Sequence, residues 1–352
     1  ASGAGTFTTV IGTGTTATTT TIVASSAYAT GIRVEGGVNN MVITNTGLIS
    51  VDAITTNGGN AQATGIVVAS NGDATPAVGD VLTINNSGDI IVRESSDGGT
   101  TWHRGMAIDV STVSNNTVIN LYDGTIYGNI DTQDGDQINV LEGRTVFNGI
   151  INPECIPVGG PTALTLDDPL QNACGNGGLT IGNGVDGGTF YMVIDDVDGP
   201  SYAFVNTFVM NEDGTLELDL PQADGTAPIG TYPQIFAETV TLNGGTLLAH
   251  IEAPSGLYET TVYENVIDGT DLTGTFDQCI VDGIPVNSLL LDFGCVYDSQ
   301  DNVDLKVTRV PFDAVPGLNQ NGTSVGYGLE CIYDVTLTGG IANVLADLFL
   351  FT

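Results

Sequence analysis

Seven glycines, each opening a short β-rich phrase, most constrain how this 352-residue chain folds. They are Gly31, Gly47, Gly65, Gly88, Gly105, Gly124 and Gly143. The steps from each glycine to the next average just under nineteen positions. Short strands, Asn-rich turns and glycines at this interval predict one coil of a β-solenoid per step, with strands of stacked coils pairing about 4.8 Å apart. A β-sandwich is the alternative, but its turns recur about every 8–12 residues.

The charge balance limits the partners of the chain. It contains 41 acidic and 6 basic residues, giving a net charge of −35, and Lys306 is its single lysine. Such a surface repels nucleic acid and anionic lipid headgroups and attracts free cations. No run of eighteen apolar residues occurs, so no membrane-spanning helix is predicted. The start at Ala1, without Met or a basic segment, is typical of a mature end after signal-peptide removal and predicts export.

The five cysteines all lie in or near the second half of the chain. Two pairs are close in sequence, Cys155 with Cys174 and Cys279 with Cys295. In an exported protein this spacing favours two local disulfides. Metal binding is the alternative, but no CxxC spacing occurs and the two histidines are distant in sequence. We expect the remaining Cys331 to be either a buried thiol or a link to another chain.

The sequence patterns divide the chain into four predicted structural segments. The Thr/Ala tract at residues 12–30 predicts strands, and Leu216, Leu218 and Leu220 alternate with acidic residues as in a strand with one wet face. The four predicted segments are N-terminal solenoid repeats at 1–151, an irregular insertion with the first cysteine pair at 152–178, further solenoid at 179–310, and a linker with a short helical end at 311–352.

Several short segments of the second half occur in the order that is typical of one protein family. They are Tyr232–Ala237, Gly245–Ala249, Val262–Ile267, Asn302–Arg309 and Pro311–Gln320. Over about residues 225–345 the chain resembles the end of the passenger domain of a bacterial type V autotransporter. The resemblance implies a right-handed parallel β-helix, transient passage through an outer-membrane β-barrel, and a location outside or on the surface of a Gram-negative bacterium. No barrel strands follow Thr352, so we expect cleavage before the barrel, with absence of the barrel as the alternative.

Catalysis is the first function that the sequence argues against. Passengers of this family can be proteases, and Gly322-Thr323-Ser324 resembles the serine motif of subtilisin-type enzymes. A serine nucleophile needs a histidine that a carboxylate orients, and neither His103 nor His250 stands in a recognisable catalytic context. A polysaccharide lyase would need clustered basic residues, whereas the six here are scattered, at Arg33, Arg93, Arg104, Arg144, Lys306 and Arg309. We therefore expect no catalytic residues.

Closely spaced acidic residues are the candidate metal ligands. Ca²⁺ takes six to eight oxygen ligands, which Asp side chains and loop carbonyls can supply. None of the clusters matches an EF-hand or a calcium-binding nonapeptide repeat, so solvated acidic turns are the alternative, and no other cofactor is predicted. The three clusters are Asp131, Asp134 and Asp136; Asp195, Asp196 and Asp198; and Asp298, Asp301, Asn302 and Asp304.

Aromatic residues offer a second binding hypothesis. Trp102, Tyr122, Tyr127 and Phe147 could form a sugar-binding stripe, but aromatic residues along a solenoid more often pack, and we expect packing.

These observations predict a secreted, non-enzymatic surface protein that self-assembles into an extracellular filament or surface layer. The two ends of a solenoid present unpaired strand edges, which contact between identical chains would satisfy. Divalent cations or salt should promote assembly by screening the acidic charge. The alternative is a monomeric adhesin that binds a host or neighbouring-cell ligand. The predicted assembly contacts, besides the Thr-rich start, are Leu345, Leu348, Phe349, Leu350 and Phe351.

Overall fold

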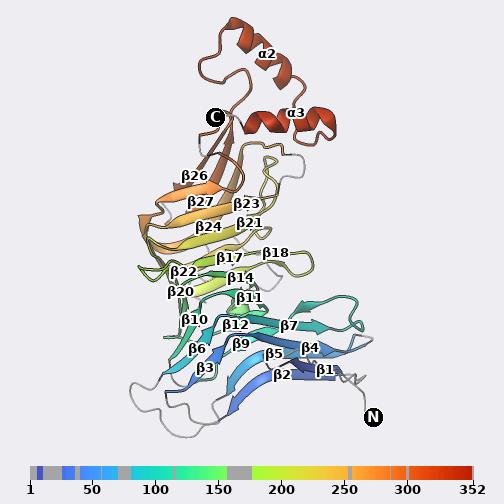
Figure 1. Cartoon of the computed structure of the whole chain (residues 1–352), viewed down its shortest axis with the longest axis vertical. Coiled ribbons are helices and arrows are strands. Elements are labelled where there is room, and N and C mark those ends of the chain that lie inside the picture. Colours follow the sequence, from blue (N-terminus) through green and yellow to red (C-terminus); the bar gives the residue numbers. More distant parts are fainter. Residues whose placement is uncertain are drawn as a thin grey trace.

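A computed structural model gives the fold of most of the chain. It describes residues 6–10, 26–35, 40–56, 58–69, 81–113, 116–156, 177–252, 256–285, 287–298 and 301–350. These residues are mostly in β-strands, which stack along the longest axis of the molecule, with the two helices at the C-terminal end (Figure 1). The predicted all-β parallel stack of coils is confirmed.

Each coil of the N-terminal half contributes one strand to each of three parallel columns. The first column is β2 (Ser26–Glu35), β5 (Asn60–Ala69), β9 (Met106–Asp109), β12 (Asn129–Asp131) and β15 (Ile150–Ile151). The second is β3 (Val42–Asn45), β6 (Leu82–Asn86), β10 (Thr117–Leu121), β13 (Gln137–Val140) and β16 (Gly178–Ile181). The third is β4 (Leu48–Ile54), β7 (Asp89–Ser95), β11 (Gly124–Tyr127), β14 (Arg144–Asn148) and β17 (Thr189–Met192).

The first two columns merge at β20 (Tyr202–Met210), which pairs with β15 at its start and with β16 at its end. They form one 15-stranded sheet, and the third column belongs to a 10-stranded sheet. From here each coil has one long and one shorter strand. These pairs are β20 with β21 (Thr215–Leu220), β22 (Gln234–Asn243) with β23 (Thr246–Ile251), and β24 (Thr261–Thr275) with β25 (Gln278–Val281).

Antiparallel strands and helices complete the stack. At the N-terminal end β1 (Thr6–Val10) lies antiparallel on β4. At the other end β27 (Val303–Arg309) pairs antiparallel with β24 and β26, and α2 and α3 follow. The remaining elements are β8 (His103–Arg104), the hairpin of β18 (Ile194–Asp195) and β19 (Gly199–Pro200), η1 (Pro153–Cys155), β26 (Leu291–Tyr297), α2 (Gln320–Glu330) and α3 (Gly340–Phe349).

The spacing between successive glycines is not the coil length, and this part of the prediction is wrong. Leu48 pairs with Asp89, so that coil is more than twice as long as the mean glycine step, whereas the coil from Gly124 to its partner Thr145 is only slightly longer than one step. The seven glycines instead belong to two columns. Gly31, Gly65 and Gly105 lie in or beside strands of the first column, and the other four lie in or beside strands of the third. A coil therefore usually contains two of the glycine steps.

Glycine and asparagine occupy the corners because neighbouring coils approach each other closely there. A Cβ on Gly88 would lie 2.0 Å from the carbonyl oxygen of Gly47 in the preceding coil. Beside it, the buried amide of Asn45 donates to Oδ1 of Asn86 at 2.7 Å. Only a residue without a side chain fits the first position, and the amide pair satisfies buried polar groups at the second.

The inward side chains form one continuous core along the stack. Leu216, Leu218 and Leu220 are buried, as their alternation predicts. Phe147 and Phe190 stack in the interior with ring centroids 5.3 Å apart. Each coil thus buries its apolar side chains against the next, as a solenoid-like fold requires.

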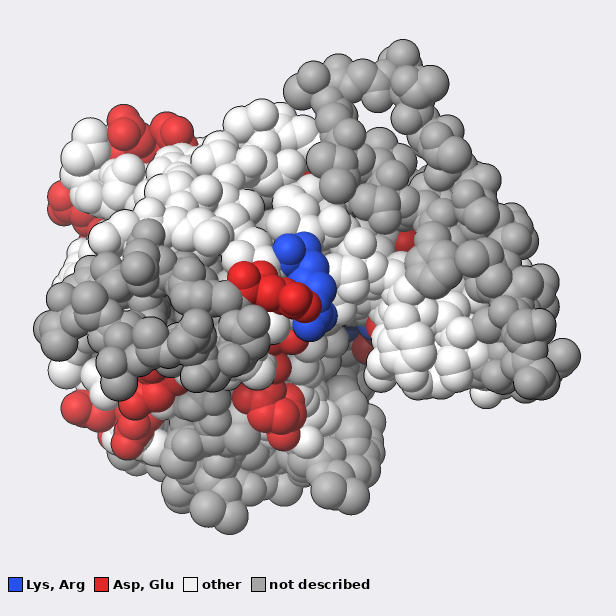
Figure 2. Space-filling view, turned by 90° about the horizontal axis from the view of Figure 1, so that it is seen from below, with Lys and Arg blue, Asp and Glu red and all other residues white. Residues whose placement is uncertain are grey.

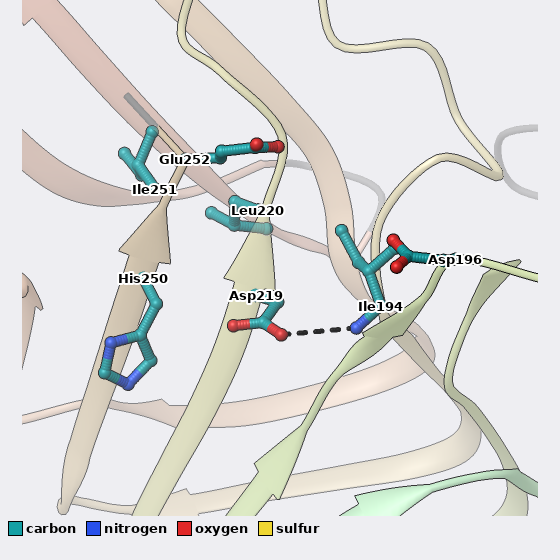
Figure 3. A pocket seen from close by; sticks show the side chains of 7 residues that line it. All are labelled: Ile194, Asp196, Asp219, Leu220, His250, Ile251 and Glu252. Atoms are coloured by element: carbon teal, nitrogen blue, oxygen red, sulfur yellow. Dashed lines mark hydrogen bonds between the residues drawn. The ribbon is translucent and has the colours of Figure 1, made fainter. Parts of the chain in front are cut away.

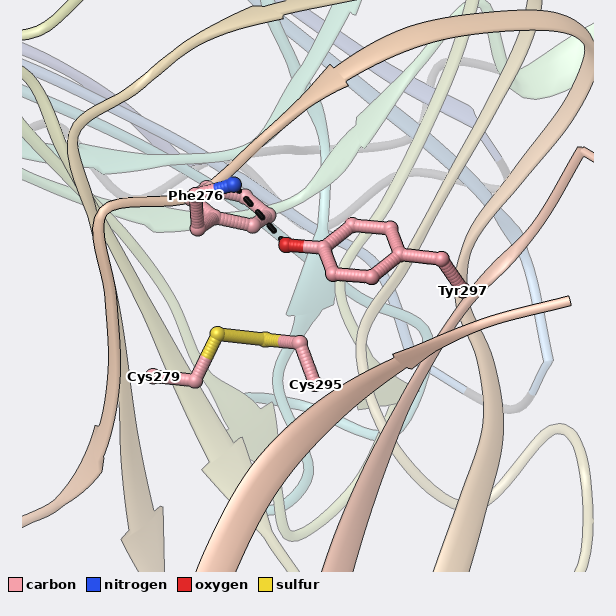
Figure 4. The surroundings of a disulfide bond; sticks show 4 residues. All are labelled: Phe276, Cys279, Cys295 and Tyr297. Carbon is pink, nitrogen blue, oxygen red and sulfur yellow. Dashed lines mark hydrogen bonds between the residues drawn. A yellow bond between two sulfur atoms is a disulfide. The ribbon is translucent and has the colours of Figure 1, made fainter.

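The C-terminal end carries the confirmed disulfide. Cys279 on β25 is bonded to Cys295 on β26, and nearby the Phe276 amide donates to the Tyr297 hydroxyl at 2.8 Å (Figure 4). Of the other predicted pair, Cys155 is buried and Cys174 lies outside the described residues, so that pairing stays a prediction.

Two expectations for the last segment need correction. Cys331 is exposed with a free thiol, which contradicts the buried alternative. The short helical end is confirmed as α3, but the preceding segment is not a plain linker because it contains α2. The Asn319 side chain caps this helix by accepting from the Gly322 amide at 2.9 Å.

Candidate functional site

A groove of about 370 Å³ lies on the outer side of the 10-stranded sheet (Figure 3). Asp219 and His250 are register partners on β21 and β23, and both point outward between inward-facing residues. Oδ2 of Asp219 accepts a hydrogen bond from the Ile194 amide at 3.3 Å. The lining residues are Ile194, Asp196, Asp219, Leu220, His250, Ile251 and Glu252.

The histidine of this groove lies between two carboxylates. Nε2 of His250 is 3.1 Å from Oε2 of Glu217, and Nδ1 is 3.3 Å from Oδ2 of Asp282. The same Glu217 oxygen accepts two hydrogen bonds from Arg144, at 2.9 and 2.6 Å. This hydrogen bond to Glu217 raises the pKa of the Arg144 guanidinium. The ion pairs connect β14, β21, β23 and the turn after β25 across the sheet.

Tyr191 completes this set of side chains. The Arg144 guanidinium carbon lies 4.2 Å from the centroid of its ring, and its hydroxyl donates to Oδ1 of Asp219. Burial, followed by the hydrogen bond to Asp219, raises the Tyr191 pKa above its usual range, so the hydroxyl is neutral.

The groove holds no constellation for nucleophilic catalysis. None of its seven lining residues is Ser, Thr or Cys, and both ring nitrogens of His250 face carboxylates. Nucleophilic catalysis by a hydroxyl needs an imidazole nitrogen directed at that hydroxyl. The arrangement links side chains of successive coils by ion pairs on their outer surface.

His103 and Ser324, the other catalytic candidates, also form contacts with neighbouring groups of the fold. Nδ1 of His103 is 2.7 Å from Oδ1 of Asp198. Beside it, the buried Arg104 donates to the carbonyls of Gly199 at 2.6 Å and Pro200 at 3.2 Å, which holds the β18–β19 hairpin against β8. Ser324 donates to the Gln320 carbonyl at 2.9 Å inside α2.

The predicted acidic clusters are built into turns. Asp136 is buried and accepts from the amides of Thr117 at 2.6 Å and Gln133 at 3.0 Å. Burial raises its pKa to about 6. Asp131 lies on β12, and burial, followed by the charge of Glu154, raises its pKa to about 6. Asp134 accepts from the side chain of Asn206 at 3.1 Å.

In the second and third clusters, three carboxylates also accept hydrogen bonds from backbone amides. Asp195 accepts from the amides of Val197 at 2.8 Å and Asp198 at 2.9 Å, and Asp298 accepts from the Asn302 amide at 3.1 Å. Asp196 lines the groove of Figure 3, while Asp301 has a positive φ of 67° and Asp304 accepts from the Asn265 amide at 2.8 Å. Within the described ranges, no group of three or more His, Cys, Asp or Glu residues is placed to hold a metal ion. A structural Ca²⁺ therefore stays a prediction.

The four aromatic residues do not form one outward stripe. Phe147 is fully buried in the core, which contradicts the sugar-binding alternative at this residue. Trp102 covers Arg93, whose guanidinium carbon lies 4.5 Å from the ring centroid. Tyr122 and Tyr127 are partly buried. The expected packing role is confirmed for Phe147.

A second groove, also of about 370 Å³, lies where the C-terminal cap, by which we mean residues 311–350, meets the turn before β26. We call it the cap groove. It is lined by apolar side chains and two glycines: Leu289, Leu290, Phe312, Val315, Leu318, Gly322, Val325, Gly326, Leu329 and Leu348. Arg309 fixes the cap to the stack, because its nearly buried side chain pairs with Glu259 and Glu330 and lies 4.2 Å from the Tyr333 ring centroid.

The structure separates the predicted assembly contacts into two groups. Leu345 and Phe349 are buried in the core, which corrects their assignment to a free contact surface. Leu348 lines the cap groove, Leu350 is exposed, and Phe351 lies outside the described residues. The sequence reasoning missed α2 and the exposed α3 residues Ile341 and Val344. The apolar residues in 341–349 cover more than one side of a helix, and this pattern could have indicated the exposed residues Ile341 and Val344.

The opposite end of the stack presents sheet edges. β2 and β3 end the 15-stranded sheet at this end of the stack, and no described strand pairs with their outer edges. By contrast, β1 covers the edge of β4. Figure 2 shows this end of the molecule, where uncharged areas separate the acidic groups. On β2 the exposed Arg33 pairs with Glu35.

Comparison with known proteins gives no identification. No family model matches the chain, and no curated protein matches it. The described helices include none that is long and apolar enough to cross a membrane. The resemblance to autotransporter passengers thus stays a prediction.

Proposed function

We propose that this chain is a non-enzymatic structural protein that associates with copies of itself into an extracellular filament or surface layer. The observation that carries the proposal is an elongated stack with different contact surfaces at its two ends. One end has the outer edges of β2 and β3, and the other has the apolar cap groove.

Both ends favour association for physical reasons. The outer edge of a strand carries N–H and C=O groups that another strand can pair with. An exposed apolar groove gains free energy when a second surface removes it from water. A unit with one such contact at each end propagates instead of closing into a small oligomer.

We further propose that the stack is a right-handed parallel β-helix released from an autotransporter precursor and displayed on a Gram-negative bacterium. The ordered phrases of residues 225–345 support this origin. The disulfide between Cys279 and Cys295 is in keeping with an oxidising compartment outside the cytosol.

Sedimentation velocity of the purified chain at several concentrations tests self-association. The net charge of −35 opposes contact between copies, and salt weakens this repulsion because the screening length is about 10 Å at 0.1 M. We expect large species whose amount grows with protein concentration and with added NaCl or CaCl₂. A monomer under all these conditions would contradict the proposal and favour the monomeric adhesin.

A further inference from the structure

We infer that the C-terminal cap binds the cap of a second copy of this chain, with the exposed side of α3 from each copy inserting into the cap groove of the other. The inference rests on the proposed self-association and assigns it a surface. α3 has two apolar sides, and only one of them is buried in the fold.

The two sides of α3 follow helical spacing. Ala342, Leu345 and Phe349 are buried against the stack. Ile341, Val344 and Leu348 form a second stripe at the same i, i+3 and i+7 spacing, and Val344 is 60% exposed. A helix that is apolar beyond one face is normally covered on the remainder as well. Of the second stripe, Leu348 packs partly against the core, whereas Ile341 and Val344 are exposed among the described residues.

The cap groove lies beside this stripe and shares Leu348 with it. Its other walls come from α2, the turn before β26, and the segment after β27. On α2 the lining residues Gly322, Val325, Gly326 and Leu329 lie on one side of the helix. Gly326 is buried and lets the segment after β27 approach α2, because a Cβ there would lie 2.4 Å from the Phe312 carbonyl oxygen. Val325 is 64% exposed although it lines the groove.

Charge selects a second copy as the occupant. Copies with a net charge of −35 repel each other, so contact between them costs least where both surfaces lack charge. None of the ten cap-groove residues is ionisable, and neither is any residue of the exposed α3 stripe. A basic partner would gain more from the acidic surface elsewhere than from this one.

Geometry then favours a symmetric contact. The projecting stripe and the receiving groove belong to one continuous surface, joined at Leu348. A two-fold axis beside Leu348 lets both copies insert and receive at once, as in isologous dimers. The sheet edges of β2 and β3 then remain at the outer ends of the pair and can join one pair to the next.

Sedimentation equilibrium of Val344→Lys and Val325→Lys beside the wild type tests the inference. Each lysine places a charge in the proposed contact, and we expect each to weaken the association at the cap by at least about tenfold. Val185→Lys is the matched control because Val185 is 81% exposed and lies in the loop before β17, outside the cap. We expect it to associate as the wild type does. Circular dichroism melting of all four proteins checks that the variants fold.

The outcomes separate the inference from the proposed function. If the wild type forms large assemblies and both cap variants assemble equally well, the cap contact is wrong and self-assembly stands. If the wild type stops at a dimer that the cap variants abolish, the cap contact stands and the extended assembly is wrong. Binding of the wild type to phosphatidylcholine vesicles, lost in Val344→Lys, would assign the cap to a lipid surface and overturn the inference.

Discussion

Replacement of Gly88 by alanine should strongly destabilise the stack, whereas the same replacement at Gly47 should not. A Cβ on Gly88 would lie 2.0 Å from the Gly47 carbonyl oxygen and 2.6 Å from its nitrogen. Nonbonded atoms rest about 3.5–4.0 Å apart, so the two coils would have to separate. Overpacking costs about 1–3 kcal/mol, and because this clash is with backbone we expect about 3 kcal/mol or more.

Gly47 is the matched control because it belongs to the same column, one coil earlier. A Cβ there would meet no described atom within 4 Å, and neither glycine has a positive φ. Gly47→Ala should therefore leave the stability within about 1 kcal/mol of the wild type, with a small gain from the less flexible unfolded chain.

Urea unfolding followed by the fluorescence of Trp102, the single tryptophan, measures both variants in the relevant region. Its indole packs over Arg93 on β7, the strand that Gly88 precedes. Equal midpoints for Gly88→Ala and Gly47→Ala would refute the close contact between coils at this corner.

Three further changes test other parts of the structure. Replacing Cys279 and Cys295 together by serine opens a link of sequence separation 16 and should lower the free energy of unfolding by about 3 kcal/mol; a variant as stable as the oxidised wild type would contradict this. Burial raises the pKa of Asp136 to about 6, so the folded state binds its proton more tightly than the unfolded chain does. The contribution of the protonated Asp136 to the free energy of unfolding is therefore present below about pH 4 and is lost as the pH rises to about 6. Relative to Asp136→Asn, the free energy of unfolding of the wild type should fall by about 2–3 kcal/mol between pH 4 and 7 in urea titrations. A difference between the two proteins that does not change with pH would refute this titration of Asp136. Arg309→Met leaves Glu330 without its cation and should cost about 2–3 kcal/mol, seen as faster hydrogen exchange in α2; unchanged exchange would show that the pair does not hold the cap.

The sequence predicts the parallel stack because glycine, asparagine and β-branched residues repeat, but it does not give the length of a coil. Gly47 and Gly65 look equivalent in sequence, yet they belong to different columns. Loops of different lengths separate the columns, so the long coil from Leu48 to Asp89 and the short coil from Gly124 to Thr145 carry similar phrases. Only the pairing of strands distinguishes a step between columns from a full coil.

The surfaces at the ends were less predictable than the coils. The apolar residues of α3 are visible in sequence, but which of them are buried depends on contacts with distant segments. Phe349, for example, packs on Tyr258, Phe312 and Tyr333. The cap groove likewise combines residues from before β26 with residues of α2 and α3, a combination that no local pattern contains.

Electron cryo-microscopy of the purified, assembled chain tests the central claim most directly. If copies associate through the ends of the stack, their strands should run across the long axis of a filament or row, with the spacing of about 4.8 Å repeating along each subunit. Contacts should occur at the cap and at the edges of β2 and β3. Isolated rods at every concentration, or contacts through the sides of the coils with both ends free, would contradict the account.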